Sequence, residues 1–126
     1  MTKSKGKYID GFVFVVPKKM IKVYKKFAVE VGKVCREYGA LEYRESIGDD
    51  LNLKDKRPKV VPFMKLIGAK SSEVVGFAWI VYRSKKQRDE VNAKMMKDKR
   101  MAELDANLPF DMRKVSYGGF EMIVEQ

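Results

Sequence analysis

Two carboxylates stand in surroundings where they could act as acids or bases. The first is Asp10, which interrupts a run from Tyr8 to Val16 that is otherwise uncharged. A buried carboxyl group without a partner is costly, and a raised pKa would make it a general acid or base. Alternatively, Asp10 lies near the start of a strand and meets solvent or a backbone donor. Asp10 is therefore one candidate catalytic residue.

Glu45 is the second candidate. It alternates with Tyr43 along residues 41–47, so both side chains are expected on one face of a strand. If that face points inward, the carboxylate and the phenol would share a pocket. However, charged side chains are also common on edge strands, where they limit pairing between molecules. An exposed, solubilising Glu45 is the competing interpretation.

Five aromatic residues could line a pocket between a sheet and its helices. They are Tyr43, Trp79, Tyr82, Phe110 and Tyr117. Aromatic rings supply apolar area, and Tyr and Trp add a polar group, which is what small-molecule pockets require. The same residues could instead pack in a core or at a subunit interface. One hypothesis is thus a site for a small, planar aromatic or acidic molecule.

The residue types that are missing limit the chemistry. The chain has no histidine, and Cys35 is its single cysteine. Triads built on histidine, the usual zinc sites and histidine-ligated haem are therefore excluded within one chain. Asp49 and Asp50 follow Gly48 and indicate a turn rather than a cation site. We expect no metal and no cofactor, and whether the protein is an enzyme stays open.

The elements that would position these residues follow from hydrophobic periodicity. Strands are expected over residues 8–16, 41–47, 74–82 and 114–124, with a further short strand at 63–69. A long helix is expected over residues 18–38, with Gly39 as its C-cap. A second helix begins at Ser84, where Ser84 and Gln87 form a capping box, and breaks near Asp98.

This order predicts an α+β protein with a ferredoxin-like βαββαβ sandwich. In that topology an antiparallel sheet carries two helices on one face, and the first and third main strands are central. Those two strands are also the most apolar ones here. Gly118 and Gly119, inside the last strand, predict a bulge or a close backbone approach.

The central strands are apolar on both faces. Phe12–Val16 and Val74–Tyr82 do not alternate with polar residues, whereas a strand with one wet face should. Two helices cover one face, so roughly six or more large side chains would remain on the other. An apolar patch of that size is rare on a monomer. We therefore expect a homodimer that pairs through its sheets.

The charge is strongly positive, since 27 basic and 17 acidic residues give a net charge of +10. A solvated basic surface is the simple interpretation, and a nucleic-acid footprint is the alternative. The segment Gly76-Phe77-Ala78-Trp79-Ile80-Val81-Tyr82 is close to the first ribonucleoprotein motif, whose aromatic residues stack on RNA bases. Val75 replaces the expected basic residue, and a sheet-paired dimer would hide these rings. RNA binding is the alternative function, and a membrane role is not expected.

Several motifs occur in a distinctive order over residues 7–124. They are Tyr8-Ile9-Asp10-Gly11-Phe12-Val13, Gly48-Asp49-Asp50, Phe77-Ala78-Trp79-Ile80-Val81-Tyr82-Arg83-Ser84-Lys85, Lys94-Met95-Met96, Arg100-Met101, Leu108-Pro109-Phe110-Asp111 and Tyr117-Gly118-Gly119-Phe120. Together they resemble the YbaA-like family, a bacterial domain of unknown function. The resemblance implies the dimeric α/β-barrel superfamily, in which ferredoxin-like subunits pair through their sheets. That superfamily includes cofactor-free monooxygenases, isomerases, haem enzymes and ligand-binding domains.

The domain organisation is expected to be simple. Residues 1–7 are basic and predict a flexible tail, and residues 8–126 predict a single domain. No apolar run approaches the roughly 18 residues of a membrane span. A single cysteine agrees with a reducing compartment, so a cytoplasmic location is expected.

Overall fold

The sheet and helices occur in the predicted order. The computed structural model describes residues 7–52 and 59–126, so the expected tail lies outside the described residues except for Lys7. Its elements are β1 (Tyr8–Pro17), a 3-10 turn (Lys18–Met20), α1 (Ile21–Glu37), β2 (Glu42–Ile47), α2 (Phe63–Ile67), β3 (Glu73–Tyr82), α3 (Lys85–Met96), α4 (Lys99–Asp105), a second 3-10 turn (Met112–Lys114) and β4 (Val115–Glu121).

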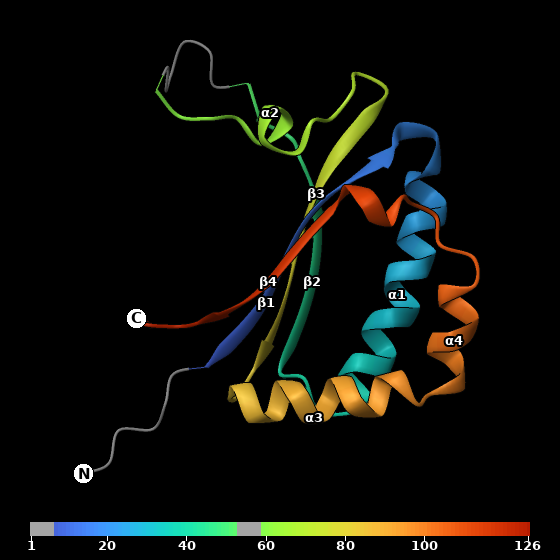
Figure 1. The fold of residues 1–126 in the computed structure, drawn as a ribbon, viewed down its shortest axis with the longest axis vertical. Helices are drawn as coiled ribbons and strands as arrows, with labels where there is room; N and C mark the ends of the chain where they lie inside the picture. The colour runs from blue at the N-terminus through green and yellow to red at the C-terminus, as the bar shows by residue number, and fades with distance from the viewer. Residues whose placement is uncertain (1–6, 53–58) are drawn as a thin grey trace.

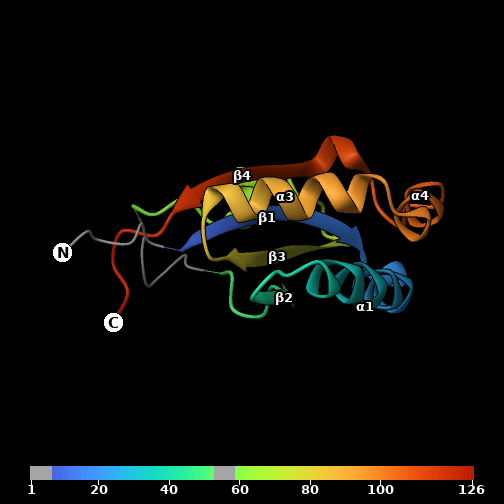
Figure 2. The same cartoon turned by 90° about the horizontal axis from the view of Figure 1, so that it is seen from below.

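The four strands form one antiparallel sheet in the order β2-β3-β1-β4. The two most apolar strands, β1 and β3, are therefore central, and β2 and β4 are the edges. This is the strand order of a ferredoxin-like fold, and the predicted α+β class is confirmed. Figure 1 shows α1, α3 and α4 on one side of the sheet, with α2 on the other. Figure 2 shows α1 and α4 on the same side of the molecule, where the two helices contact each other.

The helix-covered face carries the hydrophobic core. Strand alternation and pairing place Phe12 and Phe14 of β1 on this face, together with Ala78 and Ile80 of β3. The apolar side of α1 packs against them, and Tyr24, Val34 and Cys35 on this side are buried. The core thus lies between the sheet and the helix layer, as the periodicity of residues 18–38 predicts.

The opposite side of the sheet is here named the open face. Its side chains come from the alternate positions of the same strands: Ile9, Val13, Val15, Val75, Phe77, Trp79, Val81 and Phe120. Helix α2 contacts β1 and β3 at one end of this face, and Val15 and Val75 are buried. Phe77 and Phe120 stay 46% and 61% exposed. The apolar character of both faces is confirmed, and α2 covers part of the second one.

The prediction of a short strand at residues 63–69 is wrong. Phe63–Ile67 forms α2 instead, with Pro62 as its N-cap and Gly68 in the left-handed region with φ of 69° as its C-cap. Proline before and glycine after a short apolar run are the usual boundaries of a helix. The helix turns Phe63 onto Phe77 of the open face, with ring centroids 6.3 Å apart.

The predicted helix boundaries are close to the observed ones, although Lys18–Met20 form a 3-10 turn before α1 and the C-cap of α1 is Tyr38 rather than the predicted Gly39. Ser84 Oγ accepts a hydrogen bond from the Gln87 backbone N–H at 3.1 Å, which starts α3. Asp98 separates α3 from α4 and caps the latter by accepting from the Arg100 backbone N–H at 2.8 Å. Gly39 adopts a φ of 117° after α1. The pairing of β4 with β1 runs without a bulge. A Cβ on Gly119 would meet the Tyr8 hydroxyl. Of the two predictions for Gly118 and Gly119, the close backbone approach is therefore the correct one.

Candidate functional site

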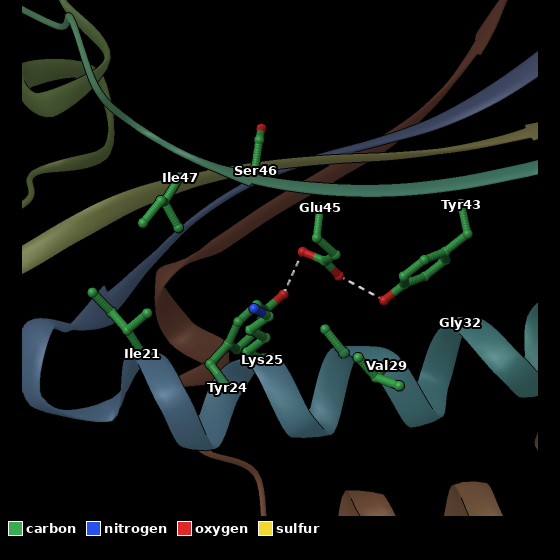
Figure 3. A pocket seen from close by; sticks show the side chains of 10 residues that line it. Ile21, Tyr24, Lys25, Val29, Gly32, Tyr43, Glu45, Ser46 and Ile47 are labelled. Atoms are coloured by element: carbon green, nitrogen blue, oxygen red, sulfur yellow. Dashed lines mark hydrogen bonds between the residues drawn. The ribbon is translucent and has the colours of Figure 1, made fainter.

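Glu45 lies on the helix-covered face of the edge strand β2, and its carboxylate points toward α1. Figure 3 shows Glu45 and Tyr43 descending from the strand together, with Tyr24 rising from the helix to meet them. Glu45 Oε1 accepts a hydrogen bond from the Tyr24 hydroxyl at 2.7 Å, and Glu45 Oε2 accepts one from the Tyr43 hydroxyl at 2.6 Å. Sequence alternation predicts the pairing with Tyr43. It does not predict the second phenol.

The electrostatics of this group are unusual for an edge-strand glutamate. Burial raises the pKa of Glu45 above its ordinary value of 4.5, although the hydrogen bonds from Tyr43 and Tyr24 oppose the rise. Burial and the nearby carboxylate also raise the pKa values of both tyrosines. No lysine or arginine of the described residues forms an ion pair with Glu45. The phenols therefore stay protonated as donors, and the carboxylate has no ion-pair partner in the part of the chain that the structure describes.

A groove of about 390 Å³ opens between α1 and β2 beside this carboxylate. It is lined mostly by apolar groups: Ile21, Tyr24, Lys25, Ala28, Val29, Gly32, Tyr43, Glu45, Ser46 and Ile47. Glu45 is the one acid among these lining residues, and Lys25 is the one base. The groove can thus hold an apolar molecule with one polar group at Glu45 and an anionic group near Lys25.

A second cavity of about 150 Å³ lies behind the first, between the sheet and the helices. Tyr24, Tyr43 and Glu45 line both spaces, so they form the wall between them. Phe110 lines this inner cavity, and its ring packs 5.7 Å from that of Tyr24. Two of the five predicted aromatic residues, Tyr43 and Phe110, are therefore brought to the Glu45 site.

Asp10 belongs to a different cluster. It is 2% exposed on the helix-covered face, and its carboxylate accepts from Arg88 Nη1 at 2.7 Å and from the Tyr117 hydroxyl at 3.1 Å. The Arg88 guanidinium also lies 4.9 Å from the centre of the Tyr8 ring. Asp10 thus has a cationic partner in the interior, so neither solvent nor a backbone donor satisfies it.

The other predicted aromatic residues lie away from Glu45. Tyr117 stacks on Phe12 at 4.9 Å and joins the Asp10 cluster. Tyr82 is fully buried, and its hydroxyl lies close to Asp10 and Cys35. Trp79 lies on the open face, where its Nε1 donates to Glu42 at 3.0 Å. The five aromatic residues therefore do not converge on one pocket.

The family follows from comparison with known proteins. The family described as "Protein of unknown function (DUF1428)" matches residues 7–112. The Uncharacterized protein YbaA of Escherichia coli strain K12 is 39% identical over 120 residues, which cover 95% of this chain and 99% of that one. The YbaA protein of Shigella flexneri matches to the same extent. The chain belongs to the YbaA-like DUF1428 family.

Two solved structures share the fold of this YbaA-like protein at 11% sequence identity. One is a dimeric ferredoxin-like protein of unknown function from Jannaschia sp. CCS1, with a TM-score of 0.55 over 91% of this chain and 99% of that one. The other is a dimeric ferredoxin-like protein from an uncultured marine organism, with a TM-score of 0.51 over 95% and 99%. The ferredoxin-like fold is thus supported independently of the strand order.

The YbaA-like site contains two residues that sequence reasoning missed. Tyr24 looks like an ordinary member of the apolar α1 stripe, and nothing in the spacing links it to Glu45. The sequence position of Gly32 carried a usable signal, since a glycine within a helix often marks a close approach.

Within residues 7–52 and 59–126, no three acidic, cysteine or histidine side chains gather as metal ligands. No helix of the described segments is long and apolar enough to cross a membrane.

Proposed function

We propose that this protein is a homodimer that binds a small molecule in the groove between α1 and β2, with Glu45 as the polar recognition group. One observation carries the proposal. A carboxylate is held by two phenols at the wall shared by two apolar cavities. A carboxylate that only improved solubility would point to water and would need no such support.

The energetics support binding rather than a purely structural role. Partial burial of a carboxylate without a cation opposes folding, because the charged form loses hydration. Two phenol hydrogen bonds offset only part of that cost, since the pKa of Glu45 remains raised. A polar group kept at such a cost beside open space is a common feature of ligand sites. A ligand that supplies a hydrogen-bond donor or a proton to Glu45 would offset this free-energy cost.

The shape of the site suggests the kind of ligand. The groove walls are apolar and partly aromatic, which suits a planar aromatic body. Lys25 at the rim suits a carboxylate or another acidic group on the same molecule. Any reaction would proceed without a cofactor. A cytoplasmic location fits a chain whose single cysteine is buried. The dimer would form through the open face, and the two solved proteins that share the fold are themselves described as dimeric.

The RNA-binding alternative has weaker support. The aromatic rings of Phe77 and Trp79 lie on the open face, whereas the lysines of α1 project from the helix layer on the other side. RNA recognition through stacking needs rings and positive charge on one surface. A dimer formed through the open face would also bury the rings.

The proposal is tested by a thermal-shift screen of planar aromatic compounds and carboxylic acids, followed by calorimetry. A true ligand raises the melting temperature progressively as its concentration increases. We expect Glu45→Gln to weaken binding at least tenfold. The matched control is Glu30→Gln, which removes the same charge from the exposed side of α1. The proposal fails if no compound stabilises the protein, or if the stabilising compounds bind Glu45→Gln as tightly as the wild type.

A further inference from the structure

Building on the proposed binding site, we propose that the Tyr24–Glu45–Tyr43 cluster moves a proton on its ligand. Glu45 removes a proton from a carbon next to a carbonyl group. As Glu45 becomes neutral, the two phenol O–H groups turn from its carboxylate to the oxyanion that forms. The ligand class is an enolisable 2-oxo acid with an apolar or aromatic body. The reaction is the reversible formation of an enolate, which takes a proton back on carbon.

Glu45 has the position of a general base. Its carboxylate lines the open groove of about 390 Å³, so it can reach a bound molecule. None of the described cations pairs with it, which leaves its basicity undiminished by a neighbouring positive charge. A base is most effective when its pKa lies closer to the working pH, and burial shifts the pKa of Glu45 in that direction.

Tyr24 and Tyr43 have the position of oxyanion donors. Both hydroxyls already lie within 2.7 Å of a Glu45 oxygen, so an oxygen bound next to Glu45 lies next to them. Each ring is held in place from behind. Tyr24 packs against Phe14, Phe27 and Phe110, with ring centroids 5.2 to 6.0 Å apart, and Tyr43 packs against Gly32. Because the rings are held, only the hydroxyl hydrogens have to rotate as the negative charge moves from Glu45 to the oxyanion, which keeps the reorganisation small.

Lys25 can bind the carboxylate of a 2-oxo acid ligand. It lines the same groove from α1, where it directly follows Tyr24, whereas Glu45 lies on β2. A 2-oxo acid that placed its carboxylate at Lys25 and its body against the apolar walls would bring its carbonyl group toward the phenols. The carbon beside the carbonyl would then face Glu45.

The step balances without any further reactant. The C–H bond breaks, its electron pair forms the carbon–carbon double bond, and the carbonyl electron pair moves to the oxygen. Glu45 carries the proton and the phenols hold the oxyanion. Return of a proton to carbon restores the carbonyl group and the carboxylate. Nothing is oxidised or reduced, and in D₂O the returned proton is replaced by deuterium because the groove is open to solvent.

The test uses phenylpyruvate as the probe, with deuterium incorporation at its methylene carbon followed by NMR in D₂O. We expect the full-length wild-type protein to accelerate the exchange over buffer alone. Glu45→Gln should lower this acceleration about 100-fold or more, the usual contribution of a positioned base. Tyr24→Phe and Tyr43→Phe should each lower it about tenfold or more, because removing one oxyanion donor slows such reactions strongly. Glu30→Gln should exchange at the wild-type rate.

Binding is measured separately, so the two proposals fail in different ways. Benzoylformate, an aromatic 2-oxo acid with no hydrogen on the carbon beside its carbonyl, should bind and compete without exchanging. If phenylpyruvate binds but exchanges no faster than with Glu45→Gln, the proton transfer is wrong and the binding function stands. If no compound of the screen binds, the binding function is wrong as well. Should Glu45→Gln fail to fold, the two tyrosine variants decide the question.

Discussion

The Tyr43 ring lies against the backbone of Gly32, so a Cβ at Gly32 would lie 2.8 Å from Cδ1 of Tyr43. The glycine therefore makes room for the phenol where β2 passes α1. Alanine would be the better residue for the helix itself, by about 1 kcal/mol. The close approach explains why glycine occupies a helix interior at this point.

Gly32→Ala is predicted to displace Tyr43 and to break its hydrogen bond to Glu45. The helix gains propensity, but the ring must move by several tenths of an ångström or more, so we expect no net gain in stability and a ligand affinity at least fivefold lower. Calorimetry and urea unfolding measure the two effects. Val23→Ala is the control, because it raises helix propensity at an exposed position of the same helix. A Gly32→Ala protein that is more stable and binds ligand normally would contradict this role for Gly32.

The ion pair between Asp10 and Arg88 predicts a large loss of stability when one partner is removed. The side chains of Arg88 and Asp10 are 13% and 2% exposed, respectively. Arg88→Met would leave the Asp10 carboxylate buried without a charge partner, at a cost of roughly 3 kcal/mol. The double variant with Asp10→Asn should recover part of that loss, since no buried charge remains unpaired. Urea unfolding of the four proteins gives the coupling.

Arg113→Met is the control for that series. Arg113 pairs with Asp111 at the surface and its side chain is 89% exposed, so its removal should change stability little. If Arg88→Met were as mild as Arg113→Met, the buried pair would contribute nothing. The interpretation of Asp10 as a structural residue would then have to be abandoned.

The raised pKa of Glu45 predicts the sign of one pH dependence. The folded protein holds the Glu45 proton more tightly than the unfolded chain, so protonation favours folding. This contribution is fully present below the ordinary pKa of 4.5 and is lost as the pH rises through the raised value. The wild type should therefore lose stability relative to Glu45→Gln between about pH 4.5 and neutrality.

Urea unfolding of both proteins across pH 4 to 7.5 measures this difference. The comparison separates the effect of Glu45 from that of groups whose pKa shifts in the opposite direction. One such group is Asp98, whose pKa is lowered by hydrogen bonds from Arg100 and Tyr38. Asp98 stabilises the fold above its ordinary pKa and loses that effect as the pH falls. A stability gap that stays constant, or that favours the wild type as the pH rises, would contradict the raised pKa of Glu45.

Sequence reasoning recovers the sheet because its signals are local. Apart from Asp10 and the terminal Glu73, β1 and β3 are apolar on both faces, which predicts two covered faces and hence two central strands. The run at residues 63–69 is too short for periodicity to separate a strand from a helix, so α2 could not be predicted this way. The sites depend on contacts between distant residues. No local sequence pattern predicts that Arg88 contacts Asp10, or that Tyr24 contacts Glu45.

The open face predicts the most direct test of the proposed assembly. Phe77 lies near its centre, packs 5.4 Å from Trp79 and remains 46% exposed although α2 places Phe63 beside it. Because the side chain is already about half buried, covering the rest of it contributes about half of the ~1.5–3 kcal/mol of a full burial, and a two-fold interface contains it twice. Phe77→Glu should therefore dissociate the dimer.

Sedimentation equilibrium at micromolar concentration measures the mass directly. The wild type should sediment at twice the 14.6 kDa chain mass, and Phe77→Glu at the chain mass itself. Val23→Glu is the matched control, because Val23 is 49% exposed but lies on α1, away from the open face. That variant should remain dimeric, since the new charge meets only solvent. A wild-type protein that sediments as a single chain would leave the exposed rings of β3 and β4 in water and would restore the RNA-binding alternative.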